Sequence, residues 1–340
     1  MTPNIHAHYT DHGVLQFCPV KLEDGCEINP GSTLMPLTRY GKHCRLRPFA
    51  VTVKGQHCEE RTEYNGNPCK AVKSLSEKVA VLFGGQGAQY PGMLENLINN
   101  RSARELLEIA SETLSMNIKE ICSPSSDAKA MQDTRITQII VFVADLMAAE
   151  VMRQKVAVDF NKVVACAGFS LGEMSALCFS GAISFNDSLR LVKTRADAMA
   201  EVSGGAMCNI KGLSRKNTEA LCSRFCCQIA NVICCDRVDG DCSNNVYVLA
   251  GTTERIDFFV NHICNDVEAG NGVTARKLRT SGAFHSTMMK KAQAKFRRVL
   301  ATIKITFPEN YLVYSNVTGL PYRSEAEIRK LLPLQLISPV

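Results

Sequence analysis

The most constraining feature of the sequence is a serine between two glycines, placed where an apolar run gives way to a helical pattern. The apolar run is VVACA at 163–167, and it leads directly into GFSLG at 168–172. A G-x-S-x-G sequence in this context predicts a nucleophile elbow, because glycines permit a sharp turn and the serine then projects above a helix N-terminus. We therefore predict that Ser170 is a catalytic nucleophile.

Strand and helix patterns alternate on both sides of this turn. An apolar run at 79–83 predicts a buried parallel strand that enters a glycine-rich turn at 84–89. Further strands are expected at 163–167 and 311–315. Helices are expected at 103–114, 137–153, 173–180, 187–202 and about 286–303. This alternation predicts an α/β fold, with a mostly parallel sheet covered by helices on both faces.

The order of elements changes between residues 205 and 279. The patterns there predict strands at 206–211, 229–234, 245–250 and 273–278, and helices at 215–225 and 253–265. The resulting β-α-β-β-α-β order is that of the ferredoxin-like arrangement. We expect a large α/β-hydrolase-like domain, residues 78–204 and 280–340, with a ferredoxin-like subdomain, residues 205–279, inserted into it.

Residues 1–77 differ from the rest of the chain. They are rich in Pro, Gly, His, Cys and Asn, lack sustained apolar periodicity, and contain turn signals such as NPG at 29–31. We expect a poorly ordered leader. It matches a mitochondrial transit peptide weakly, since Asp11, Glu23 and Asp24 are acidic and the basic stretch 39–54 lacks serine.

A serine hydroxyl needs a base to take its proton. Of the seven histidines, five lie in the leader, and His262 falls within a predicted helix of the small subdomain. His285 lies in SGAFHS at 281–286, a loop that opens the next helix of the large domain. Such a loop histidine can reach across to a nucleophile, although a capping or surface role would fit it equally well.

Arg195 lies on an apolar face of the predicted helix 187–202. Val192, Arg195, Met199 and Val202 are spaced three, four and three residues apart and therefore share one face. A structural salt bridge, or a side chain that snorkels to solvent, would explain an arginine there. The sharper hypothesis is a substrate carboxylate, which a planar guanidinium binds through two parallel hydrogen bonds.

Together these motifs resemble the malonyl-CoA:acyl-carrier-protein transacylase family, in its animal mitochondrial form. The resemblance covers residues 78–340. It rests on VLFGGQGAQ at 81–89, GFSLGE at 168–173, Arg195, GAFHS at 282–286, YSNV at 314–317 and QLISPV at 335–340. Gly84, Ala88 and Ile139 depart from the family, which has proline, serine and proline there. Family members continue past the final Ser-Pro-Val, so we expect a C-terminally truncated chain.

The resemblance implies a catalytic role for five residues. Ser170 would attack the malonyl thioester, and His285 would be its base. The backbone carbonyl of Gln335 would orient the histidine in place of a triad aspartate. Backbone N–H groups of Gln86 and Leu171 would form the oxyanion hole.

Three further residues would bind the substrate. Arg195 would hold the free malonyl carboxylate, with Gln138 lining the pocket nearby. Phe284 resembles the residue of the malonyl-selective members rather than the methylmalonyl-selective ones. The chain would thus transfer malonyl from malonyl-CoA to the phosphopantetheine thiol of acyl carrier protein through a malonyl-serine intermediate, as part of fatty acid synthesis.

The expected partners are malonyl-CoA and acyl carrier protein, and no resident cofactor or metal is implied. A net charge of +6 is too small to indicate nucleic acid. The most apolar stretch, 139–151, is too short to cross a membrane and carries Asp145 and Glu150. We expect a monomer, and the resemblance implies a mitochondrial location.

Sixteen cysteines do not form a recognisable metal pattern. The densest group contains no C-x-x-C pair, which disfavours zinc, and reduced thiols are expected. The members of this group are Cys222, Cys226, Cys227, Cys234, Cys235 and Cys242.

Three other functions fit parts of the sequence. An ordinary α/β-hydrolase would share the elbow, use a Ser-Asp-His order and release malonate to water. A patatin-like lipase would pair the serine with an aspartate, for which Asp239-Gly240 is the only suggestive dipeptide. A non-catalytic chain would bind acyl carrier protein without turnover.

Overall fold

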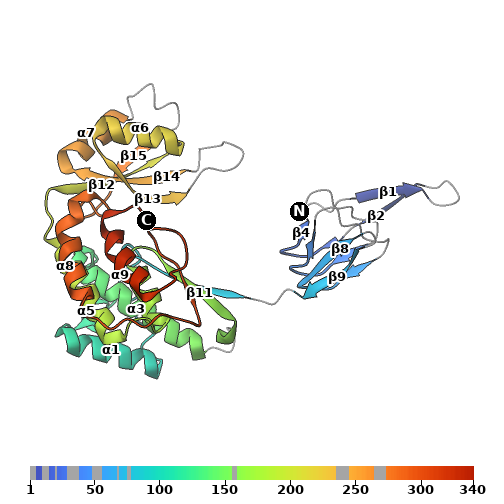
Figure 1. The fold of residues 1–340 in the computed structure, drawn as a ribbon, viewed down its shortest axis with the longest axis horizontal. Coiled ribbons are helices and arrows are strands. Elements are labelled where there is room, and N and C mark those ends of the chain that lie inside the picture. The colour runs from blue at the N-terminus through green and yellow to red at the C-terminus, as the bar shows by residue number, and fades with distance from the viewer. Residues whose placement is uncertain are drawn as a thin grey trace. The chain divides into compact units, whose positions relative to one another are not determined.

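The computed structural model divides the chain into two compact units, Met1–Lys78 and Val79–Val340, which are considered separately (Figure 1). The described residues are 5–9, 15–19, 21–28, 38–47, 56–66, 69–74, 78–154, 159–234, 245–263 and 273–340. Within them, no helix is long and apolar enough to cross a membrane.

The N-terminal unit contains a short parallel solenoid. Lys21 pairs with Arg39, which pairs with His57, and Glu27 likewise pairs with Arg45, which pairs with Glu63, so in-register partners lie 18 residues apart. The parallel strands are β3 (Lys21–Leu22), β5 (Arg39–Tyr40), β7 (His57–Cys58), β4 (Glu27–Ile28), β6 (Arg45–Leu46) and β8 (Thr62–Gly66). Antiparallel pairs join β8 to β9 (Cys69–Ser74) and β1 (Ile5–Tyr9) to β2 (Leu15–Pro19).

These strands were not anticipated from the sequence. Most of the parallel strands are only two residues long, so none produces the alternating apolar pattern of an ordinary strand. Stacking of equivalent positions buries Tyr40, Cys44, Leu46, Cys58 and Tyr64 in a core of the unit. The signal that could have revealed the coils is self-similarity at a fixed period, as between GCEI at 25–28 and HCRL at 43–46. That the segment is a leader remains a prediction.

The second unit is built around a three-stranded parallel sheet, as the apolar runs predicted. Its order is β10 (Val79–Phe83), β11 (Val163–Gly168) and β16 (Leu312–Val313). Val81 and Phe83 are buried, whereas Leu82 between them is 78% exposed. The expectation that helices cover both faces is therefore wrong at β10, where the face bearing Leu82 is open in the part of the chain that the structure describes.

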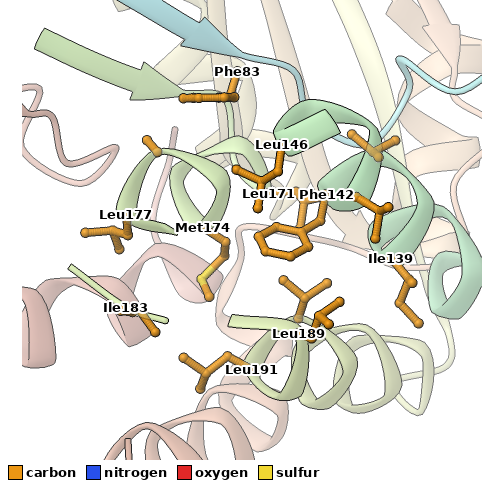
Figure 2. Packing of buried hydrophobic residues seen from close by; sticks show 14 of the residues in the cluster. Phe83, Ile139, Phe142, Leu146, Leu171, Met174, Leu177, Ile183, Leu189 and Leu191 are labelled. Atoms are coloured by element: carbon orange, nitrogen blue, oxygen red, sulfur yellow. The ribbon is translucent and has the colours of Figure 1, made fainter. Parts of the chain in front are cut away.

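Helices pack against the other face of this sheet. Phe142 of α3, Leu171 and Met174 at the start of α4, and Leu189 of α5 meet in one apolar core (Figure 2). The helices of the large sheet are α1 (Arg101–Leu114), α3 (Thr134–Gln154), α4 (Gly172–Phe179), α5 (Phe185–Ala200) and α8 (Lys290–Leu300). All five were predicted. The short α2 (Ile118–Ile121) and the C-terminal α9 (Glu325–Leu334) were not.

A separate antiparallel sheet carries residues 205–277. Its order is β13-β14-β12-β15, and α6 and α7 contribute to its own apolar core, which includes Ile210, Leu249 and Phe259. The elements are β12 (Gly205–Lys211), α6 (Arg215–Phe225), β13 (Gln228–Cys234), β14 (Val246–Thr252), α7 (Thr253–Ile263) and β15 (Thr274–Lys277). Every predicted element of this region is present. Residues 264 and 265, the predicted end of α7, lie outside the described residues.

Candidate active site

The turn between β11 and α4 is a strained elbow that only glycine-flanked sequence can form. Ser170 has a φ of 53°, in the left-handed region that residues with a side chain seldom adopt. A Cβ on Gly168 would lie 2.0 Å from the backbone of Gly172, and one on Gly172 would lie 2.5 Å from the carbonyl oxygens of Phe83 and Gly84. Close backbone packing thus fixes both glycines and points Ser170 away from the sheet.

Gly168→Ala is expected to lower the free energy of unfolding by about 1–3 kcal/mol or more, because the added methyl group overlaps backbone that cannot move aside. Gly84→Ala is the matched control, since its Cβ would meet the nearest atom, the Cβ of Ala88, at 3.4 Å. Urea unfolding of both variants measures the difference. Equal stabilities for the two variants would contradict the packing argument.

Ser170 and His285 form a hydrogen-bonded dyad. Ser170 Oγ lies 2.8 Å from His285 Nε2, and His285 Nδ1 lies 2.8 Å from the backbone oxygen of Gln335. A carbonyl oxygen only accepts, so the neutral imidazole carries its proton on Nδ1 and leaves Nε2 to accept the proton of Ser170. The Gln335 carbonyl thus does what a triad aspartate does elsewhere, which is to set the tautomer and orientation of the base.

His285 is held as a neutral base. It is 4% exposed, and burial lowers the pKa of His285 to about 4, with a further lowering by the nearby Arg195 cation. The Gln335 carbonyl acts in the opposite direction. A folded pKa below that of an unperturbed histidine means that the imidazole can accept a proton throughout the neutral pH range.

An NMR titration of the imidazole is expected to show His285 neutral down to about pH 4. Arg195→Gln should move this pKa upward, since it removes the nearby cation, yet leave it below the usual value near 6.5 because the ring stays buried. A His285 pKa near 6.5 in the unmodified chain, or one insensitive to Arg195→Gln, would contradict this assignment.

Arg195 is buried beside the dyad. Its side chain is among the largest that are fully buried, and it donates to Gln138 Oε1 at 2.7 Å, to Ser170 Oγ at 2.9 Å and to Gln335 Oε1 at 2.8 Å. Burial lowers the pKa of Arg195 to about 10, so it remains a cation at neutral pH.

This arrangement separates the two interpretations of Arg195. The side chain is 1% exposed and does not snorkel, and its hydrogen-bond partners are uncharged. Its Nε is one of the buried side-chain atoms with no hydrogen-bond partner among the described residues. A buried cation with neutral partners and a spare donor favours an anionic substrate group.

A cavity of about 200 Å³ opens onto the dyad at the junction of the two sheets. Gln86 and Phe284, both predicted as site residues, line it, whereas Arg195 and its hydrogen-bond partner Gln138 do not. Arg195 contacts the cavity wall through the lining residue Ser170. The lining residues are Gln86, Phe169, Ser170, Met199, Met207, Asn231, Ile233, Val248, Leu278, Thr280, Phe284 and His285. Its walls are largely apolar, as expected of a site that shields a thioester from water.

The backbone N–H groups predicted for an oxyanion hole are unoccupied donors. Leu171 follows the nucleophile at the N-terminal end of α4, and Gln86 lies in the turn after β10. Among the residues that the structure describes, neither N–H has an acceptor. The Gln86 side chain donates from its Nε2 to Thr134 Oγ1 at 3.1 Å.

Asn316 is a residue of the site that sequence reasoning missed. Its Oδ1 accepts from the Ser170 N–H at 2.7 Å, and its Nδ2 donates to the Gly168 carbonyl at 2.8 Å. One amide therefore clamps both sides of the elbow. The motif YSNV at 314–317 contributed to the resemblance without indicating this contact.

No group of three or more metal-ligating side chains occurs among the described residues. The cysteine side chains that the structure describes are free thiols. Cys235, Cys242 and Asp239, on which the metal and patatin-like hypotheses depend, lie outside the described residues.

Comparison with known proteins gives one family. Residues 81–326 match the model of the acyl transferase domain. A Drosophila melanogaster protein described as a probable mitochondrial malonyl-CoA-acyl carrier protein transacylase is 34% identical over 292 residues, covering 83% of this chain and 73% of that protein. The human mitochondrial malonyl-CoA-acyl carrier protein transacylase is 34% identical over 272 residues, which are 76% of this chain and 67% of that protein.

Solved structures agree. The acyl-carrier-protein S-malonyltransferase of Bartonella henselae has a TM-score of 0.67 at 30% identity, covering 78% of this chain and 82% of that one. A malonyl-transacylase in complex with its type II PKS acyl-carrier protein has a TM-score of 0.68 at 28% identity, with the same coverage.

Proposed function

The chain belongs to the malonyl-CoA:acyl-carrier-protein transacylase family of acyltransferases, and from that premise we propose that Ser170, His285 and Arg195 carry malonyl from coenzyme A to the phosphopantetheine thiol of acyl carrier protein. The observation that supports these roles most directly is the contact of Ser170 Oγ with both His285 Nε2 and Arg195 Nη2. A nucleophile, its base and a carboxylate-binding cation thus meet at one oxygen.

In the first half-reaction, Ser170 Oγ attacks the thioester carbon while its proton passes to His285 Nε2. The oxygen that becomes negative would be held by the N–H groups of Gln86 and Leu171, which have no acceptor among the described residues and are free to donate to it. The carbon–sulfur bond then breaks, and the leaving sulfur takes the proton from His285. Coenzyme A departs as a thiol and leaves a malonyl ester on Ser170.

The second half-reaction reverses these steps with a new thiol. The phosphopantetheine thiol of the carrier gives its proton to His285 and attacks the ester carbon. Collapse of the intermediate returns the proton to Ser170 Oγ and releases malonyl-carrier. Phosphopantetheine belongs to the partner, so this chain supplies only the nucleophile, the base, the donors and the cation.

Arg195 provides the selectivity for malonyl. Its guanidinium would grip the terminal carboxylate of the substrate, with Gln138 and Gln335 fixing its plane. Phe284 would bound the pocket beside the α-carbon and disfavour a methyl branch there. An acetyl group leaves this buried cation without a carboxylate in direct contact, which penalises acetyl thioesters.

We further propose that β12–β15 with α6 and α7 form a ferredoxin-like subdomain, and that the remainder of residues 78–340 is α/β-hydrolase-like. The antiparallel order β13-β14-β12-β15 supports the first assignment. A monomer, a role in fatty acid synthesis and a mitochondrial location are also proposals. The last rests on animal relatives described as mitochondrial.

Transfer of radiolabelled malonyl from malonyl-CoA to holo-acyl carrier protein tests this function. Label should appear on the holo-carrier, and apo-carrier, which lacks the thiol, is the matched control. Release of free malonate with no labelled carrier would instead identify a hydrolase. Binding of the carrier with no label on either protein would identify a non-catalytic partner.

A further inference from the structure

Glu173 is a buried acid next to the site that the proposed mechanism does not use. It lies in the first turn of α4 with no exposed surface. Its Oε1 accepts from the Tyr322 hydroxyl at 2.5 Å and the Asn316 N–H at 3.2 Å, and its Oε2 accepts from Gln335 Nε2 at 2.5 Å. Every partner is a donor, so both carboxylate oxygens are satisfied only as acceptors.

The Gln335 side chain links this acid to the site. Its Nε2 donates to Glu173 Oε2 and, at 2.7 Å, to the Ser170 carbonyl, while its Oε1 accepts from Arg195 Nη2 at 2.8 Å. The backbone carbonyl of the same residue holds His285 Nδ1. One glutamine therefore touches the nucleophile, the base and the cation.

The orientation of the Gln335 side-chain amide depends on the acceptors that its NH₂ group meets. With the amide reversed, the Gln335 NH₂ would face the Arg195 NH₂, and its oxygen would face the oxygens of Glu173 and Ser170. Donor would then meet donor and acceptor would meet acceptor. The ionised Glu173 carboxylate, which only accepts, and the Ser170 carbonyl together fix the amide in the direction that presents an oxygen to Arg195.

We propose that Glu173 is a positioning residue: through the Gln335 amide it holds Arg195 in the orientation that binds the malonyl carboxylate and keeps Gln335 in place behind His285. It touches neither substrate nor reacting atoms. The proposal rests on the function proposed above for Ser170 and Arg195.

The same carboxylate also supports the elbow. By accepting from the Asn316 N–H it holds the residue whose side chain clamps Gly168 and Ser170. Burial raises the pKa of Glu173 to about 7, and its hydrogen bonds with Tyr322, Gln335 and Asn316 oppose that shift. The acid is acceptor-only in its ionised form, which these three donors and the nearby Arg195 cation favour.

Glu173→Gln is the sharpest test, since it preserves size and changes only one acceptor into a donor. The new NH₂ must face either the Asn316 N–H or the Gln335 NH₂, so it opposes a donor on either side. We expect kcat/KM for malonyl-CoA to fall by about 10- to 100-fold, while the thermal unfolding midpoint falls by only a few degrees and the chain stays folded at the assay temperature. Glu108→Gln, the same chemical change on the exposed side of α1, is the matched control and should leave the rate unaltered.

Two readouts separate positioning from a general loss of structure. Because the effect passes through Arg195, Glu173→Gln should slow acylation of Ser170 by malonyl-CoA more than acylation by acetyl-CoA. The ratio of the two rates, malonyl over acetyl, should fall by about 10-fold. In a double-mutant cycle, Glu173→Gln should lower the malonyl rate little further once Gln335→Ala is present, since both substitutions remove the same contact between Glu173 and the Gln335 amide. Tyr322→Phe, which leaves the Gln335 contact intact, should cost less than Glu173→Gln.

Equal losses for malonyl and acetyl, additive losses in the cycle, or an unaltered rate in Glu173→Gln would each overturn the proposal. Its failure is distinguishable from failure of the proposed function. In the latter case the unsubstituted chain itself does not transfer malonyl.

Discussion

Replacing Ser170 by alanine is expected to lower kcat for malonyl transfer by at least about 10⁴-fold, because no other hydroxyl of the described residues contacts both the base and the buried cation. Loss of the nucleophile removes the covalent intermediate rather than weakening it. The steady-state transfer rate from malonyl-CoA to holo-acyl carrier protein measures the effect.

Ser170→Ala should remain folded. The side chain contributes a hydroxyl and little apolar volume, and the backbone at this position already adopts a positive φ, which alanine tolerates about as well as serine. The control is Ser125→Ala, an exposed serine of the loop after α2, which should transfer at the unsubstituted rate. A folded Ser170→Ala chain that retains the covalent step would show that another residue is the nucleophile.

The second large effect is on substrate choice. Arg195→Ala should lower kcat/KM for malonyl-CoA by about 10³- to 10⁴-fold and change that for acetyl-CoA far less, so the preference for malonyl disappears. The physical reason is that Arg195 is 1% exposed and that its hydrogen-bond partners among the described residues are all uncharged. A substrate carboxylate would therefore be the only charged group in direct contact with the guanidinium. Competition between the two thioesters in one reaction measures the ratio directly.

Two further variants serve as controls for Arg195→Ala. Arg190→Ala removes an exposed arginine five residues earlier on α5 and should preserve the ratio. Arg195→Lys keeps the charge but loses the planar pair of donors, so it should recover only part of the preference. Undiminished discrimination in a folded Arg195→Ala chain would mean that the malonyl carboxylate is bound elsewhere.

Local patterns predicted the parts of the fold whose signals are local. The apolar run at 79–83 and the helix at 215–225 were expected with the bounds that the structure gives them. The N-terminal coils were not predicted because their two-residue strands are defined by partners 18 residues away rather than by neighbours along the chain. The exposure of Leu82 was not predicted because an apolar run does not indicate which of its side chains a helix will cover.

The site divides in the same way. The elbow was predictable at Ser170 because the glycines on either side of the serine indicate a sharp backbone turn at that position. Sequence context singled out His285 and Arg195 as candidates, and the resemblance assigned their roles and supplied the Gln335 carbonyl. It did not supply the Gln335 side chain, Glu173 or Asn316, whose roles arise from hydrogen bonds between residues more than 140 positions apart.

Digestion and mass spectrometry of the chain after brief exposure to malonyl-CoA, quenched in acid, is the most direct test of a covalent relay through the elbow. A single malonyl ester should map to Ser170 and vanish when holo-carrier is added before the quench. Malonyl transfer to the carrier with the ester on any other residue, or with no acyl-enzyme at all, would contradict the mechanism.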